Sequence, residues 1–325
     1  MNKKAICLIS GGLDSLIAIK MMQDQGVECV GINFVSPFFS NKMKDFAKNK
    51  FDFQYEEISV GEDFFSTIIN PPNGHGSHMN PCIDCKIYML KMAKSLLTKF
   101  DAGFIVTGEV LGQRPMSQQR MALARIEKQA DLVGYLLRPL SALHLPITIP
   151  EQNGVVDREK LLDISGRSRK IQFDLAKKYG IEDFCTPAGG CLLAEELFAE
   201  KLKDLIENSQ DAKLSDAEIL KYGRHFRYKK NKIIVGRNNF ENEKLIELKK
   251  EGDIVFFVPN CGSPATILQA PSDEDAIAFA ASLTAFYSDA KEEVVCVEYG
   301  EPSKKIEVKQ PDKSDVDKYN LSIKK

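Results

Sequence analysis

The chain has 325 residues, of which 43% are hydrophobic and 28% charged, and its 44 Lys and Arg nearly balance its 46 Asp and Glu. This composition is typical of a folded globular protein and excludes a chain that is mainly disordered. The length exceeds the ~100–200 residues of one typical domain, so we expect two domains. No run approaches the ~18–20 apolar residues of a membrane span, and the start shows no signal-peptide cleavage pattern. We therefore expect a cytosolic protein with no membrane partner and with reduced cysteines.

Apolar runs in the first half of the chain alternate with stretches of helical periodicity. Four of these runs predict buried strands, at residues 3–10, 27–34, 53–60 and 103–108. Such alternation predicts parallel pairing in a doubly wound α/β sheet. Ligands of such sheets bind at the carboxyl ends of the strands, so the segments that follow the strands are the candidate site.

Shorter elements are expected in the second half, with strands at residues 224–229, 232–236 and 253–258 and a helix at 271–287. They indicate a compact α+β module. We place the domain boundary close to residue 205, which gives an α/β domain at residues 1–205 and a smaller α+β domain at residues 206–325. The end of the second domain is expected to be a polar C-terminal tail.

A glycine turn joins the first strand to the first helix, and it reads Ser10, Gly11, Gly12, Leu13, Asp14 and Ser15. Glycines let the backbone approach an anion, and the helix N-terminus offers free amides and a positive dipole. The turn lacks the Lys-Ser/Thr ending of a Walker A loop, and its Asp14 suggests a carboxylate that holds Mg²⁺ beside phosphates. The alternative is a tight turn in which Asp14 and Ser15 only cap the helix.

The Ser-Gly-Gly-Leu-Asp-Ser motif resembles the PP-loop of the ATP pyrophosphatase superfamily, whose members adenylate a substrate and release pyrophosphate. The resemblance implies an adenine nucleotide alpha hydrolase-like fold in which the six residues of the motif bind ATP. It also places Asn33 and Phe34 near adenine, and Thr107 and Gly108 along the nucleotide site. Asp14 would be the catalytic magnesium ligand.

Two thiols, Cys82 and Cys85, follow a Pro/Gly-rich loop at a spacing that suits one metal ion, one cluster or one reversible disulfide. The loop and a distal Gly-Gly-Cys191 segment resemble the PP-loop tRNA 2-thiouridine synthetases, in which Cys85 and Cys191 would be the catalytic cysteines. The three-cysteine branch of that family implies a [4Fe-4S] cluster on Cys82, Cys85 and Cys191. Its persulfide branch implies that one cysteine carries sulfur and the other helps to release it. Cys185 is an alternative to Cys191.

A local zinc site is a further alternative for the loop, because His75 and His78 precede Cys82 and Cys85 at short spacings. Glu109, which follows Thr107 and Gly108, departs from the thiouridine synthetases, where a His is frequent.

A basic stripe at residues 221–240 holds seven Lys and Arg and no Asp or Glu. Beside it, the Val-Gly-Arg-Asn-Asn string at residues 235–239 resembles the NFACT-type RNA-binding module, over about residues 215–290. Lys and Arg bind RNA phosphates and release counterions. The candidate RNA contacts are Arg224, Arg227, Lys229, Lys230 and Arg237 in this stripe, and Arg167, Arg169 and Lys170 at the start of a helix, although solvated helix faces would look similar.

These features predict an ATP-dependent tRNA sulfurtransferase that adenylates a uridine carbonyl and replaces its oxygen with sulfur. Its partners would be tRNA and a sulfur donor, either sulfide or a persulfide carrier protein. One alternative is a PP-loop enzyme that adenylates a small carboxylate or amide. The other is a non-catalytic RNA-binding factor that binds a nucleotide.

Overall fold

The computed structural model describes residues 2–39, 52–184 and 191–323, which lie in two compact units, residues 1–194 and 195–325. The predicted boundary near residue 205 falls inside helix α8 (Glu196–Asn208), which belongs to the second unit. This helix buries Phe198 and Leu202, so its apolar face makes it part of a folded core and not a linker.

The first unit is a five-stranded, fully parallel sheet with the strand order β3-β2-β1-β4-β5. Its strands are β1 (Lys4–Leu8), β2 (Glu28–Val35), β3 (Gln54–Ser59), β4 (Phe104–Thr107) and β5 (Leu136–Leu137). Together with the helices between the strands, this arrangement confirms the predicted doubly wound α/β fold. The central strands are buried on both faces, which explains their nearly continuous apolar sequence.

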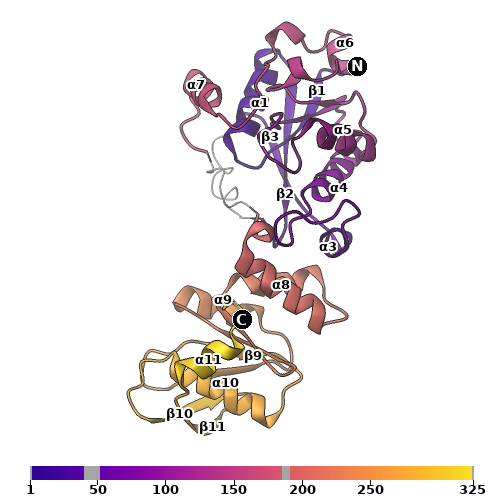
Figure 1. Ribbon diagram of the computed structural model, residues 1–325. Coiled ribbons are helices and arrows are strands. Elements are labelled where there is room, and N and C mark those ends of the chain that lie inside the picture. The colour runs from indigo at the N-terminus through magenta and orange to yellow at the C-terminus, as the bar shows by residue number, and fades with distance from the viewer. Residues whose placement is uncertain (1, 40–51, 185–190, 324–325) are drawn as a thin grey trace. The chain divides into compact units, whose positions relative to one another are not determined.

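Helices cover both faces of this sheet, with α1 and α7 on one side and α4 and α5 on the other (Figure 1). The helices of the unit are α1 (Leu13–Asp24), α3 (Glu62–Ile69), α4 (Cys82–Ser95), α5 (Arg120–Gln129), α6 (Ile149–Gln152) and α7 (Lys170–Lys178). Because Leu8 pairs with both Ile32 and Thr107, the ends of β1, β2 and β4 meet at one edge. The candidate site lies at this edge.

The second unit is built on a six-stranded antiparallel sheet with the order β11-β10-β8-β9-β7-β6. Its strands are β6 (Arg224–Tyr228), β7 (Asn231–Val235), β8 (Ile254–Phe257), β9 (Thr266–Leu268), β10 (Val294–Tyr299) and β11 (Lys304–Lys309). Between these strands lie helix α9 (Asn239–Leu248), after β7, and helix α10 (Glu274–Phe286), after β9, and helix α11 (Lys313–Tyr319) follows β11. The predicted smaller α+β domain is confirmed.

The predicted polar tail is wrong for most of its length, because residues 294–319 form β10, β11 and α11. Val295 and Val297 alternate with more exposed residues and enter the core, while the charged positions of β11 face outward. The abundance of Lys and Glu hid this period-two pattern. Among the described helices, none is long and apolar enough to cross a membrane.

Candidate active site

The turn between β1 and α1 leaves the start of the helix open. Gly11 takes a positive φ of 71°, a conformation that glycine adopts without strain, and Gly12 is the N-cap. In the described part of the chain no side chain caps α1; the Ser15 hydroxyl instead donates to the Gly12 carbonyl at 2.8 Å. The prediction that Asp14 and Ser15 serve only as caps is therefore not supported. The geometry leaves backbone amides available for an anion.

Gly108 brings the end of β4 against this turn. A Cβ atom at Gly108 would lie 2.5 Å from the backbone of Asp14 and Ser15, a distance that real Cβ contacts do not reach. Thr107, the last residue of β4, is buried beside it. Asn33 and Phe34 lie in the last three residues of β2, and Phe34 is buried. These four residues thus lie at the ends of the strands that the sequence assigns to them, and their contact with a nucleotide stays a prediction.

Both carboxylate oxygens of Asp14 accept hydrogen bonds from side chains that the sequence did not place near Asp14. Gln113 donates to Oδ2 at 2.7 Å, and Arg169 donates to Oδ1 at 3.2 Å. Gln172 in turn donates to the Gln113 side chain at 3.2 Å. Arg169, a candidate RNA contact, therefore faces the glycine turn, whereas Arg167 and Lys170 are exposed.

Backbone pairing brings the distal cysteine segment to the Pro/Gly-rich loop. Cys191 forms an isolated bridge with Phe39, after the end of β2. Two residues later, the Leu193 carbonyl accepts a hydrogen bond from the Met79 amide at 3.2 Å, just before the loop reaches Cys82. Cys85 lies in the first turn of α4. Cys185 and the Gly-Gly pair before Cys191 lie outside the described residues.

The three predicted cysteines interact electrostatically. Burial, followed by the nearby Cys191 and Cys82, raises the pKa of the Cys85 thiol far above its ordinary value, although Lys86 acts in the opposite direction. Burial is also the main cause that raises the pKa of Cys191 to about 11, with Cys82 adding to it and Arg114 opposing it. Both side chains are therefore neutral thiols at neutral pH, and deprotonation of one disfavours deprotonation of the others.

A metal ion at these cysteines stays a prediction. Within the described ranges, no group of three or more His, Cys, Asp or Glu side chains is arranged to hold an ion. The His75 ring donates to the Ile68 carbonyl at 2.7 Å, and the Cys82 thiol donates to the Asn80 side chain at 3.0 Å. The arrangement of the described residues thus supports neither the iron-sulfur prediction nor the zinc alternative.

A buried ion cluster connects the cysteine helix to the end of β4. Glu109 is 3% exposed and accepts from Arg138 at 3.0 Å, and Lys86, the neighbour of Cys85, lies 3.4 Å from its other oxygen. Burial alone would raise the pKa of Glu109, but the charges of Lys86 and Arg138 outweigh it and hold that pKa below its ordinary value. Glu109 therefore stays ionised and fixes Lys86 beside Cys85.

The Glu109→Gln variant is expected to lower the free energy of unfolding by about 3 kcal/mol, because it leaves a buried guanidinium short of one partner. The estimate is at the lower end of the range for broken buried pairs, since Arg138 keeps its contact with Glu127 at 2.9 Å. Urea unfolding followed by circular dichroism measures the change. The Glu127→Gln control, at a more exposed carboxylate, should cost less; equal costs would contradict the role of Glu109.

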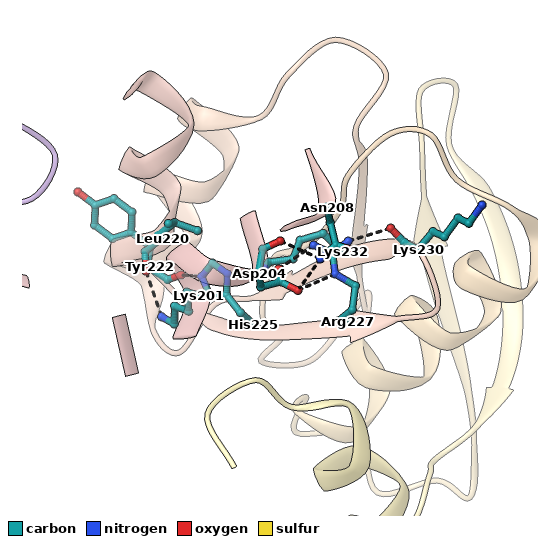
Figure 2. A network of polar contacts seen from close by, with 9 residues as sticks. All are labelled: Lys201, Asp204, Asn208, Leu220, Tyr222, His225, Arg227, Lys230 and Lys232. Atoms are coloured by element: carbon teal, nitrogen blue, oxygen red, sulfur yellow. Dashed lines mark hydrogen bonds and ion pairs between the residues drawn. The ribbon is translucent and has the colours of Figure 1, made fainter. Parts of the chain in front are cut away.

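Many charges of the basic stripe have partners inside the second unit. Arg227 and Lys232 both bind the Asp204 carboxylate of α8, at 2.7 and 2.5 Å, as Figure 2 shows. Lys229 pairs with Asp275, Arg237 with Glu241, and the Arg224 guanidinium lies over the Tyr287 ring at 4.5 Å. In Figure 2 the Lys230 ammonium points away from the network. RNA contact by these residues stays a prediction, and Arg227 would have to share its charge with Asp204.

Two further buried groups complete this network. Lys201 donates to the carbonyls of Leu220 and Gly223 at 3.0 and 3.3 Å, and burial lowers its pKa to about 8. His225 is fully buried and donates its Nε2 hydrogen to the Tyr222 carbonyl at 2.8 Å (Figure 2), while its Nδ1 has no partner among the described residues. Burial and the charges of Lys232 and Lys201 lower the pKa of His225 well below its ordinary value.

This environment predicts acid sensitivity. His225 stays neutral in the folded state, so the unfolded state binds one more proton below pH ~6.5 and the free energy of unfolding falls as the pH falls. Between pH 7.0 and 5.5 the loss attributable to His225 is about 1 kcal/mol. Urea unfolding of wild type and His225→Gln at both pH values checks it, since glutamine still donates to Tyr222 and does not titrate. Equal pH dependence of the two proteins would contradict the prediction.

Two family models match separate parts of the chain. The model described as thiamine biosynthesis protein (ThiI) matches residues 1–145, and the model described as NFACT protein RNA binding domain matches residues 223–320. The resemblance predicted from the sequence is confirmed. The NFACT match extends past residue 290, the end of the predicted range, and takes in all of β10, β11 and α11, in agreement with the fold of the second unit.

Curated relatives resemble part of the chain. A protein named "Probable tRNA sulfurtransferase" from Methanocaldococcus jannaschii is 31% identical over 145 residues, which are 43% of this chain and 37% of that protein. Its namesake from Methanosarcina mazei is 28% identical over 239 residues, 67% of this chain and 51% of the relative. The chain thus spans about half the length of these relatives or less. A solved 4-thiouridine synthetase–RNA complex with bound ATP is 20% identical, with a TM-score of 0.34, over 55% of this chain and 51% of the solved one.

Proposed function

We propose that the chain is an ATP-dependent tRNA sulfurtransferase whose first unit activates and thiolates a uridine and whose second unit binds RNA. The proposal is supported by the match of residues 1–145 to ThiI and by the names of the curated relatives. ATP would bind at the glycine turn through its six residues, with Asn33 and Phe34 near adenine and Thr107 and Gly108 along the nucleotide.

One observation carries the proposal: two pairs of consecutive residues link the glycine turn to the cysteines. In each pair, one residue contacts the turn and the next acts on a cysteine or on its neighbour. Gln113 holds Asp14, and Arg114, the next residue, acts on the charge of Cys191. In the same way, Gly108 touches the turn and Glu109, the next residue, holds Lys86 beside Cys85. An activated substrate and a sulfur-carrying group can therefore meet at one edge of the sheet.

Activation would begin with attack of the uridine carbonyl oxygen on the α-phosphate of ATP. A new O–P bond forms, the bond to the leaving pyrophosphate breaks, and the base becomes adenylated. The free amides at the start of α1 stabilise the negative charge on the phosphates. Asp14 offers the oxygen ligands that Mg²⁺ prefers, and an ion held there would neutralise phosphate charge.

Sulfur would then replace the activated oxygen. A sulfur nucleophile forms a C–S bond at the carbon while the C–O bond breaks, and AMP leaves with the electron pair. In the persulfide form of this step, a persulfide carrier protein transfers its outer sulfur atom to one of Cys85 and Cys191 and keeps a thiol, so that this cysteine carries the sulfur as a persulfide. The thiolate of the other then forms a disulfide with it and releases the thiolated base, and an external thiol reductant restores both cysteines.

RNA binding by the second unit would hold the tRNA while the base is exposed to the site. The proposal is supported by the match of residues 223–320 to an RNA-binding domain. Specific RNA recognition commonly uses unstacked bases, and enzymes that modify a base must take it out of the stack. Lys230 is the best candidate RNA contact in the basic stripe. Its side chain is exposed, and its ammonium points away from the internal network.

The test is AMP release from ATP by anaerobically prepared protein with Mg²⁺ and a sulfur donor, either sulfide or a low-molecular-weight persulfide in parallel reactions, with and without bulk tRNA that lacks modifications, followed by mass spectrometry of the tRNA nucleosides. AMP that depends on tRNA, together with a thiolated nucleoside, is the expected result. AMP release without tRNA would instead favour adenylation of a small carboxylate or amide. Tight tRNA binding without AMP would favour the non-catalytic binding factor and would overturn the proposal.

A further inference from the structure

An exposed aromatic ring lies at the end of the basic stripe. Phe240, in the first turn of α9, is 61% exposed. Its ring centroid lies 6.2 Å from that of Tyr222, and the two rings meet edge-on at an angle of 69°. Figure 2 shows the Tyr222 ring turned away from the buried ion network. Single exposed apolar side chains are common on protein surfaces, but two adjacent rings form an apolar surface with a preferred mutual geometry.

One buried carboxylate fixes the backbone on both sides of this aromatic pair. Glu241, the residue after Phe240, is 7% exposed and accepts from the Gly223 amide at 3.2 Å and from the Arg237 amide at 2.9 Å. Gly223 directly follows Tyr222, so these hydrogen bonds tie together the two segments that carry the rings. The aromatic pair is therefore held in place before a ligand binds, which lowers the entropy that binding costs.

The charged side chains around the aromatic pair balance one another. Each acidic side chain that interacts electrostatically with Tyr222 forms an ion pair with a basic residue three or four positions away. These ion pairs are Glu218 with Lys221, Glu241 with Arg237, and Glu247 with Lys244. A locally neutral ring surface suits a nucleobase, because every base has a π face, whereas a phosphate is bound through net positive charge.

We propose that Phe240 stacks against an unpaired base of the bound tRNA, with Tyr222 supporting its ring from the side. This inference rests on the proposed function, because it needs RNA at the second unit. The basic stripe at residues 221–240, which ends at Phe240, offers charges for the RNA backbone. Single-stranded nucleic acids are commonly bound by such a combination of basic side chains and aromatic rings. Stacking uses the face of a base and not its hydrogen-bonding edge, so Phe240 would hold a nucleotide without reading its identity.

The test measures the affinity of the full chain for unmodified tRNA and for a long RNA duplex, by filter binding at several salt concentrations. Phe240→Leu keeps an apolar side chain and removes the ring, so it should bind tRNA about tenfold more weakly than wild type, the effect of losing one stacked base. Its affinity for the duplex should stay as in wild type, because nearly all bases of the duplex are paired. The salt dependence of tRNA binding should also stay unchanged, since no phosphate contact is lost.

Two further variants show whether the ring itself is responsible. Phe240→Tyr keeps a ring and should bind tRNA as wild type does. Phe257→Leu is the matched control, because it removes the same ring from a side chain of β8 that is 43% exposed, and it should also bind as wild type does.

Equal tRNA affinities of wild type and Phe240→Leu would overturn the stacking role alone. Equal losses for tRNA and duplex, or a weaker salt dependence in Phe240→Leu, would overturn it too, because either result assigns Phe240 to the backbone contacts. If wild type does not bind tRNA, RNA binding by the second unit is overturned as well. Thermal unfolding checks the fold, and if Phe240→Leu is unfolded, Phe240→Gln, whose side chain suits an exposed helix position, decides the outcome by the same comparison.

Discussion

The Cys85→Ser variant is expected to release pyrophosphate from ATP in the presence of tRNA and to form at least about a thousandfold less thiolated nucleoside than wild type. The proposed mechanism assigns the activation to the glycine turn and Asp14, and the later sulfur step to Cys85. Serine keeps the size of the side chain but cannot carry sulfur. Pyrophosphate release and nucleoside mass spectrometry on the same reaction measure the two steps separately.

Two other cysteines provide the comparison. Cys191→Ser should show the same separation of the two steps, since Cys191 lies near enough to Cys85 to raise the pKa of its thiol. Cys261→Ser changes an exposed cysteine of the second unit and should behave as wild type. Thiolation by Cys85→Ser at the wild-type rate would remove the cysteine pair from the mechanism.

Cys82→Ser distinguishes the two sulfur chemistries that the sequence left open. If the mechanism uses only the Cys85 and Cys191 thiols, Cys82→Ser should still form the thiolated nucleoside. A [4Fe-4S] cluster on three cysteines should lose a ligand and with it the bound iron. The iron content of anaerobically purified wild type and variant, measured beside the nucleoside product, therefore decides between them.

Local patterns were sufficient to predict the first unit. Apolar runs and helical spacing predicted the strands β1 to β4 and their parallel pairing, because each buried strand between helices leaves a strong signal in its own sequence. The glycine turn was equally local, since all six of its residues are contiguous. The common location of Cys82, Cys85 and Cys191 came from the resemblance, and the backbone pairs of Cys191 and Leu193 give its physical cause.

Partners that depend on tertiary docking left no local signal. Gln113 and Arg169 meet at Asp14 only because the segments that carry them are held side by side through Leu111 and Gly166. Likewise, the sequence shows the charge of Arg227 but not its partner Asp204, which lies on α8, a helix that the predicted boundary near residue 205 places largely in the first domain. The sequence shows which segments carry basic side chains. Only the fold shows which of these side chains are already paired with a carboxylate of the same protein.

The Asp14→Asn variant should lose the activation step itself, with pyrophosphate release reduced at least about a thousandfold and thiolation lost in parallel. Asparagine keeps the shape of the side chain but removes the negative charge that would hold a cation and that now holds Arg169. Affinity for tRNA should not change, because RNA binding is assigned to the second unit. Pyrophosphate release with saturating tRNA, beside a filter-binding titration, measures both quantities.

Asp24→Asn, an exposed position at the other end of α1, is the matched control and should act as wild type. The comparison of Asp14→Asn with Cys85→Ser is more informative than the loss of activity in either variant alone. If Asp14→Asn removes both products while Cys85→Ser removes only the thiolated nucleoside, activation and sulfur transfer are separate steps at one sheet edge. If Asp14→Asn still releases pyrophosphate, the phosphate chemistry lies elsewhere and the open amides of α1 serve another anion.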